Sequence, residues 1–206
     1  MSDLSALGPE AVRKAREAIR EALGFTRGRP LDRGLPAIWQ EHRGVFVTLR
    51  RYPSSELRGC IGFPRPTRPL IEALREAAVA AALDDPRFPP VRPHELGRLT
   101  VEVSILTVPE PIGGATPAAR LAQVRTGVDG LILERDHRSG LLLPQVAVEQ
   151  RWGPEAFLRG VSEKAGFAPT AWAEPETRLY RFQALIASER SPEGEVTVTA
   201  PEAAPP

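Results

Sequence analysis

The spacing of apolar residues along the chain predicts two kinds of element, amphipathic helices and half-buried strands. Apolar residues recur every three or four positions in 9–23 and 69–83, which places them on one face of a helix. Between 99 and 108 apolar and polar residues alternate, which is typical of a strand with one buried face. The two periods together predict a fold that contains both helices and sheets.

The same criteria predict the other elements and the class of fold. Further strands are expected at 44–50, 57–63, 130–135, 140–143 and 178–187, and further helices at 118–124, 144–150 and 154–165. Several successive strands are separated by too few residues for a crossover helix. A mostly antiparallel α+β fold with flanking helices is therefore predicted.

Two segments fall outside these elements. Residues 24–36 form a connection rich in glycine, proline and arginine. Residues 188–206 are polar and rich in proline, and we expect this tail to be partly disordered. Within the tail, 195–199 could pair as an edge strand. The remainder, 1–187, is expected to be a single domain.

Composition is that of an ordinary globular protein and limits the partners. The 206 residues are 42% hydrophobic and 26% charged, with a formal net charge of +1. Nucleic-acid binding usually leaves a basic patch or stripe, and the sequence contains none, although a local groove for nucleic acid stays open. The sequence has no apolar run of about 18 residues and no signal-peptide pattern, so we expect a cytoplasmic protein with no membrane contact.

Residue usage adds three expectations. All but two of the 27 basic residues are arginines and 22 residues are prolines, which suits a thermostable protein. The single cysteine, Cys60, excludes an intrachain disulfide and a zinc site built on several cysteines. The three histidines lie in no metal-ligand spacing, so no metal or cofactor is predicted, although carboxylate ligands stay open.

The segment Leu57–Gly62 is the best candidate for a working site. Read as a strand, it places Arg58, Cys60 and Gly62 on one face. A cation beside a thiol raises the thiolate fraction, so Cys60 and Arg58 are candidate catalytic residues, and Gly59 and Gly62 are candidate substrate-binding positions. The alternative is that Cys60 is a buried packing residue, because free cysteine is among the most buried residue types.

Two neighbouring segments carry further candidate substrate-binding residues. In the irregular segment 85–90, Asp85 and Arg87 are candidates, and Arg87 could hold a carboxylate or phosphate in bidentate fashion. Alternatively this is a rigid loop in which Asp85 caps or bridges. On the polar face of the alternating strand, Glu102 could act as a base or pair with one of the two arginines, and Ser104 shares that face. The alternative is that both are ordinary surface residues.

Four motifs in a fixed order resemble the AMMECR domain family. They are Leu-Arg-Gly-Cys-Ile-Gly at 57–62, Asp-Pro-Arg-Phe-Pro-Pro at 85–90, Val-Glu-Val-Ser-Ile-Leu at 101–106 and Ser-Gly-Leu-Leu-Leu-Pro-Gln-Val at 139–146. The likeness runs from about Gly44 to Phe182. It implies an α+β fold of two tightly associated subdomains around a cleft, with the first motif near that cleft. Gln145, in the last motif, joins the predicted substrate-binding set.

The resemblance implies a fold but no reaction. Microbial members of the family occur with Memo-like and radical-SAM proteins, which implies such partners and a redox or modification pathway. Three functions are open: an enzyme that uses the Cys60 thiolate, a binding module for a small molecule, nucleotide, RNA or protein, and a scaffold for a partner enzyme. We favour a cleft that binds an anionic small molecule or nucleotide, with catalysis at Cys60 left open.

Overall fold

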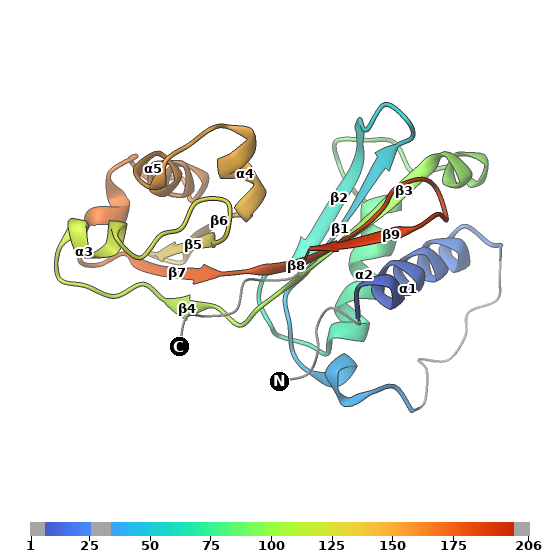
Figure 1. The fold of residues 1–206 in the computed structure, drawn as a ribbon, viewed down its shortest axis with the longest axis horizontal. Coiled ribbons are helices and arrows are strands. Elements are labelled where there is room, and N and C mark those ends of the chain that lie inside the picture. The colour runs from blue at the N-terminus through green and yellow to red at the C-terminus, as the bar shows by residue number, and fades with distance from the viewer. Residues whose placement is uncertain (1–6, 26–33, 200–206) are drawn as a thin grey trace. The chain divides into compact units, whose positions relative to one another are not determined.

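The computed structural model describes residues 7–25 and 34–199, which form two compact units (Figure 1). Unit 1 contains the described residues up to Leu106 and those from Leu185 onward, whereas unit 2 contains 107–184. Part of the predicted connection at 24–36 and the last residues of the predicted tail lie outside the described residues. Among the described residues, unit 1 thus combines sequence from before and after unit 2, whereas unit 2 is one continuous stretch.

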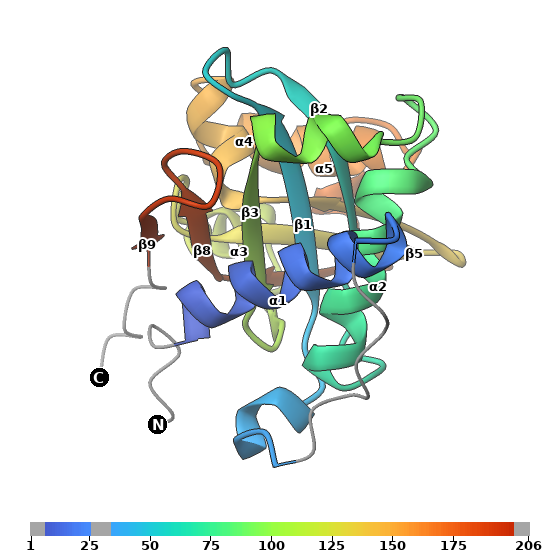
Figure 2. The ribbon, with the colours of Figure 1, turned by 90° about the vertical axis from the view of Figure 1, so that its right-hand side faces the viewer.

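Unit 1 is a sheet covered on one face by two helices. Its five strands lie in the order β2-β1-β3-β8-β9. They are β1 (Val45–Arg51), β2 (Leu57–Phe63), β3 (Leu99–Leu106), β8 (Ala184–Glu189) and β9 (Val196–Thr199). Helices α1 (Leu7–Ala22) and α2 (Leu70–Leu83) pack side by side against this sheet (Figure 2). Two 3-10 helices, η2 (Ala37–Gln40) and η3 (Pro93–Arg98), complete the unit.

The core of unit 1 lies between the helices and the sheet. Alternate residues of the central strands, including Val47, Leu49 and Val101, are fully buried there. The alanine-rich face of α2 allows a very close approach to β2: a Cβ added to Gly59 would lie 2.0 Å from the carbonyl oxygen of Ala81. Gly59 is therefore required by helix packing.

A buried ion pair ties the first helix to the end of the sheet. The guanidinium of Arg16, in α1, donates to the carboxylate of Glu189, in β8, from Nε at 2.8 Å and from Nη2 at 2.5 Å. Glu189 also accepts the backbone N–H of Val101 at 2.9 Å. Because both charged side chains are almost fully buried, each depends on the other for compensation.

Unit 2 has its own sheet and its own core. Its four strands, in the order β4-β7-β5-β6, are β4 (Glu110–Pro111), β5 (Gly130–Arg135), β6 (Arg138–Leu142) and β7 (Arg178–Phe182). Its helices are α3 (Pro117–Leu121), α4 (Pro144–Glu149), α5 (Pro154–Lys164) and the 3-10 helix η4 (Ala171–Ala173). Phe157 and Leu131 are fully buried in this second core.

The α+β prediction is confirmed, with one correction at the end of the chain. The ladders β1–β2, β1–β3, β4–β7, β5–β6, β5–β7 and β8–β9 are all antiparallel. The strand predicted at 178–187 is in fact two strands, β7 and β8, which belong to different sheets. They separate at Gln183, whose backbone N–H donates to the hydroxyl of Thr107. The edge strand predicted at 195–199 is confirmed as β9. Within the described residues, no helix is long and apolar enough to span a membrane.

Candidate functional site

A row of polar side chains crosses the sheet of unit 1 on the face opposite the helices. Cys60 of β2 pairs with Thr48 of β1, and Thr48 pairs with Glu102 of β3. The Thr48 hydroxyl donates to the Cys60 sulfur at 3.3 Å, and the hydroxyl of Ser188, in β8, donates to Glu102 at 2.6 Å. Ser188 therefore takes the place of the arginine that was expected to pair with Glu102.

The backbone of Cys60 is held by a loop at the outer edge of the sheet. β2 is the first strand in the sheet order, so its outer side is free to receive residues 84–92. The Asp85 carboxylate accepts the Cys60 N–H at 2.8 Å, and Arg87 Nη2 donates to the Cys60 carbonyl oxygen at 3.0 Å. Arg87 also donates to Asp85 from Nε at 3.0 Å and from Nη2 at 2.8 Å. The loop thus supplies hydrogen bonds that a neighbouring strand would otherwise supply.

The charges of this loop stabilise each other. The hydrogen bond from Arg87 holds the pKa of Asp85 well below its usual range; burial opposes this shift, and the N–H groups of Cys60 and Arg87 add to it. Asp85 in turn raises the pKa of Arg87, against burial, and an interaction with the Cys60 side chain adds to the increase. Arg87 is therefore a cation that lies close to the thiol. Its side chain is 54% exposed, whereas that of Asp85 is 2% exposed.

Arg58 departs from the face that strict alternation predicts. The register between β1 and β2 shifts, because Leu49 pairs with Gly59 whereas Arg50 pairs with Leu57. Arg58 is therefore an extra residue in β2, so that two residues of β2 lie opposite one residue of β1. This is the pattern of a β-bulge. The prediction that Arg58 shares a face with the thiol is therefore corrected, since a bulge interrupts the period of two.

The bulge directs Arg58 to Glu95. Nε of Arg58 donates to Oε1 of Glu95 at 3.1 Å, and Nη2 donates to Oε2 at 3.2 Å. Nη2 also lies 3.4 Å from the carbonyl oxygen of Pro90. The Arg58 side chain is only 3% exposed, so this two-bond contact neutralises a buried charge.

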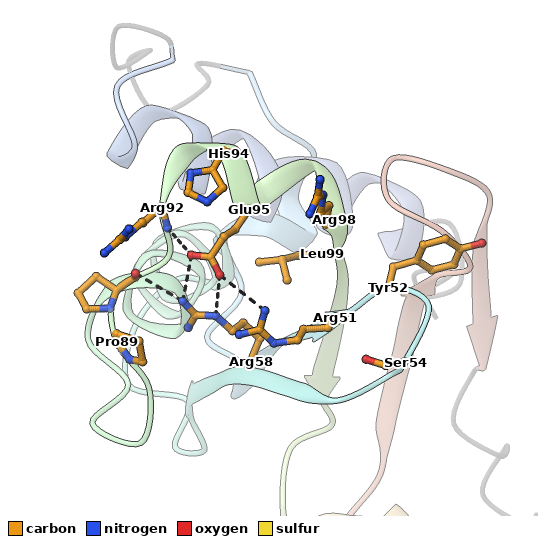
Figure 3. A pocket seen from close by; sticks show the side chains of 11 residues that line it. Arg51, Tyr52, Ser54, Arg58, Pro89, Arg92, His94, Glu95, Arg98 and Leu99 are labelled. Atoms are coloured by element: carbon orange, nitrogen blue, oxygen red, sulfur yellow. Dashed lines mark hydrogen bonds and ion pairs between the residues drawn. The ribbon is translucent and has the colours of Figure 1, made fainter.

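Arg58 and Glu95 form one wall of a pocket of about 560 Å³ in unit 1 (Figure 3). The pocket is built from the tip of the β1–β2 hairpin, the loop that follows α2, and η3. Its charged lining residues are four arginines and one glutamate, namely Arg51, Arg58, Arg92, Arg98 and Glu95. We call this the arginine pocket.

Glu95 is already engaged with its neighbours. Besides Arg58, it accepts the backbone N–H of Arg92 at 2.8 Å, and Nη1 of Arg51 lies 3.8 Å from its Oε1. Burial would raise the pKa of Glu95, but the Arg58 hydrogen bond, the Arg92 N–H and the charges of Arg58 and Arg51 outweigh it and lower the pKa. Glu95 is therefore ionised, and its single charge cannot offset all four arginines.

Two of the pocket arginines have no partner in the part of the chain that the structure describes. The guanidinium groups of Arg92 and Arg98 are exposed and form no hydrogen bond or ion pair with residues 7–25 or 34–199. Other exposed or half-buried arginines of unit 1 differ: Arg43 binds Glu41, and Arg13 binds Glu17. Excess positive charge therefore collects at the mouth of the arginine pocket.

The other predicted site residues, Gly62, Ser104 and Gln145, lie elsewhere in the structure. The space above Gly62 is filled by the ring of Phe46, since a Cβ there would lie 2.3 Å from a ring carbon. Ser104 is buried on β3 and pairs with Phe46. Gln145 lies at the start of α4 in unit 2, and its substrate-binding role stays a prediction. Among residues 7–25 and 34–199, no group of three or more histidine, cysteine, aspartate or glutamate side chains is placed to hold a metal ion.

Sequence reasoning missed the arginine pocket because its lining comes from three separate segments. A weak signal was present in the sequence: Arg92 and Arg98 flank a short stretch that contains His94 and Glu95. Nothing in that stretch indicates that the β1–β2 hairpin lies opposite.

These features define an α+β protein of two compact units, with a thiol on the edge strand β2 and an arginine-lined pocket to which Arg58 of the same strand contributes. A family model described as AMMECR1 matches residues 12–187, and the chain belongs to this family. The resemblance predicted from the four motifs is thereby confirmed.

Similar proteins come from thermophilic archaea. The chain is 52% identical to a protein of Methanothermobacter thermautotrophicus over 182 residues, which cover 88% of this chain and 94% of that protein. It is 48% identical to a protein of Methanocaldococcus jannaschii over 189 residues, which cover 92% and 93%. The crystal structure of an uncharacterised protein from Pyrococcus horikoshii matches with a TM-score of 0.86 and 46% identity, covering 95% of this chain and 97% of that chain.

Proposed function

We propose that this AMMECR1-family chain binds a small anionic molecule, of the size of a nucleotide or smaller, in the arginine pocket beside the Leu57–Gly62 segment. The observation that carries the proposal is the charge of the pocket. Four arginines line it, Glu95 is the one carboxylate among its described lining residues, and Arg58 already binds that carboxylate.

The size and chemistry of the pocket support this proposal. A volume of about 560 Å³ lies within the range of roughly 300–1,000 Å³ that small-molecule sites occupy. The planar fork of a guanidinium matches a carboxylate or phosphate group in two-bond geometry. Arg58, fixed by Glu95 and Pro90, gives the pocket a rigid inner wall. Arg92 and Arg98 are available to a ligand because they have no partner among the described residues.

Calorimetric titration with phosphate compounds tests the proposal. The wild-type protein is titrated at low ionic strength with inorganic phosphate, pyrophosphate and adenosine monophosphate, because salt screens exposed charges. At least one of these anions is expected to bind. Arg98→Ala should weaken that binding at least about twofold, because only Arg92 of the two unpartnered arginines then remains available to a compact anion.

A matched control separates the pocket from general charge effects. Arg159, in α5 of unit 2, is also exposed and has no partner among the described residues, so Arg159→Ala removes the same charge elsewhere. Its affinity for the anions should equal that of the wild type. Equal losses in the Arg98 and Arg159 variants, or no binding of any of the anions, would show that the arginine pocket is not an anion site.

A second candidate function is thiol chemistry at Cys60. It is supported by the Thr48 hydroxyl, which donates to the sulfur, and by Arg87, whose charge interacts with the Cys60 side chain. A hydroxyl donor and a cation beside sulfur both favour the thiolate, which is the nucleophilic form. The half-buried position of Cys60 leaves part of its surface open to a reagent.

A further inference from the structure

The unpartnered arginines of the pocket lie at two ends of one helix. Arg92 directly precedes η3, and Arg98 is its last residue. A 3-10 helix rises about 2 Å per residue, so six positions separate the two Cα atoms by roughly 12 Å. Figure 3 shows Glu95 between them, with Arg92 on one side and Arg98 on the other.

The carboxylate between the two arginines disfavours an anionic group at the centre of the pocket. Glu95 is ionised, and like charges repel strongly at the short distances of a shared site. A single compact anion would therefore reach one arginine end at a time. Two anionic groups on one molecule could occupy both ends, provided that they are separated by a neutral spacer that passes Glu95.

Glu95 also indicates what the spacer carries. Its Oε2 accepts two hydrogen bonds, from Arg58 and from the Arg92 N–H, whereas its Oε1 accepts one, from Arg58. Nη1 of Arg51 lies 3.8 Å from Oε1, beyond hydrogen-bond distance. A carboxylate oxygen has two lone pairs, so Oε1 can accept one further hydrogen bond, such as one from a hydroxyl group.

We propose that the arginine pocket takes a ligand with two phosphoryl groups joined by a hydroxyl-bearing spacer, of which a sugar bisphosphate is the simplest example. One phosphoryl group binds at Arg92, the other binds at Arg98 and Arg51, and a spacer hydroxyl donates to Glu95. This inference rests on the proposed anion-binding function of the same pocket and specifies its ligand class.

Calorimetric titration with three probes tests the two-ended arrangement. The probes are fructose 1,6-bisphosphate, fructose 6-phosphate and inorganic phosphate, and the proteins are the wild type, Arg92→Ala, Arg98→Ala and the control Arg159→Ala. The wild type should bind the bisphosphate at least about tenfold more tightly than the monophosphate, because the second contact is intramolecular. Circular dichroism verifies that each variant is folded.

The variants should show a pattern that general charge loss does not produce. Arg92→Ala and Arg98→Ala should each reduce bisphosphate affinity to the monophosphate level. Monophosphate affinity should fall only about twofold, because one of two ends remains available. The Arg159 variant should match the wild type with every probe.

Two other results would be decisive. If all three probes bind the wild type equally well and binding still depends on Arg98, the pocket binds anions but the two-phosphoryl inference is wrong. If no probe binds, the anion-binding function and the inference that rests on it both fail.

Discussion

Replacing Asp85 by alanine should lower the free energy of unfolding by about 1.5–4 kcal/mol. The Asp85 carboxylate accepts hydrogen bonds from the N–H groups of Cys60 and Arg87 and from two guanidinium nitrogens of Arg87. Through these bonds it holds the outer edge of β2, where the loop 84–92 meets the sheet.

The magnitude follows from what each partner loses. The Arg87 side chain is 54% exposed, so water can solvate its guanidinium after the substitution. Losing the ion pair between Arg87 and Asp85 therefore lowers stability by only about 0–1 kcal/mol. The Cys60 N–H loses a charged acceptor at 2.8 Å, and such a bond contributes roughly 1.5–3 kcal/mol. The two losses add to about 1.5–4 kcal/mol.

The effect should depend on pH in a defined direction. The folded pKa of Asp85 is lowered relative to the unfolded value of about 3.9, so its contribution to stability is fully present well above that value. As the pH falls below about 4, the unfolded chain takes up the proton first. The contribution is then lost progressively until the folded carboxylate is itself protonated. The difference between wild type and variant should therefore be constant from pH 6 to 8 and shrink below about pH 4.

Equilibrium unfolding in guanidinium chloride, followed by circular dichroism, measures this difference. Glu17→Ala serves as a control, because Glu17 forms an exposed ion pair with Arg13 in α1 and should change stability by no more than about 0.5 kcal/mol. If the Asp85 variant lies as close to the wild type as the control does, or if its deficit is undiminished at pH 3, the carboxylate charge does not hold the sheet edge.

Two further substitutions test the geometry of β2. Gly59→Ala places a methyl group against the backbone carbonyl oxygen of Ala81 in α2. It should destabilise the protein by about 1–3 kcal/mol in the same unfolding assay. A neutral result would mean that the helix can move away at little cost. Arg87→Ala should slow the alkylation of Cys60 by iodoacetamide in the folded protein several-fold, as measured by mass spectrometry, whereas Arg58→Ala should leave the rate unchanged. The reverse order of the two rates would make Arg58 the cation that acts on the thiol.

Sequence patterns predicted local elements well because hydrophobic periodicity is a property of each segment. β2 occupies Leu57–Phe63 and α2 occupies Leu70–Leu83, within one residue of the expected bounds. Periodicity does not specify which sheet a strand joins. Consequently the apolar pattern of 178–187 predicted one strand, although the chain passes there from the sheet of unit 2 to that of unit 1.

The candidate site was less predictable because it depends on the directions of side chains. Strict alternation predicted that Arg58 lies on the same face as Cys60. The extra residue at the β-bulge interrupts the alternation, so this prediction does not hold. Glu102 meets Ser188, 86 positions later in the chain, and spacing along a sequence carries no information about such a contact. Residue chemistry and the family resemblance both indicated Leu57–Gly62 as the candidate segment, whereas the contacts made by its side chains required the three-dimensional structure.

Unit 1 is built from sequence that lies before and after unit 2, so it cannot be completed during translation until unit 2 has been synthesised. Among the residues that the structure describes, unit 2 is one continuous stretch, so its whole sheet can leave the ribosome as one piece. Arg16 is synthesised early, but Glu189, which compensates its buried charge, follows 173 positions later. The nascent first helix therefore has to remain without its ionic partner while all of unit 2 is synthesised. Unit 1 therefore begins first and is completed last, and its early segments expose their apolar faces until β8 has been synthesised.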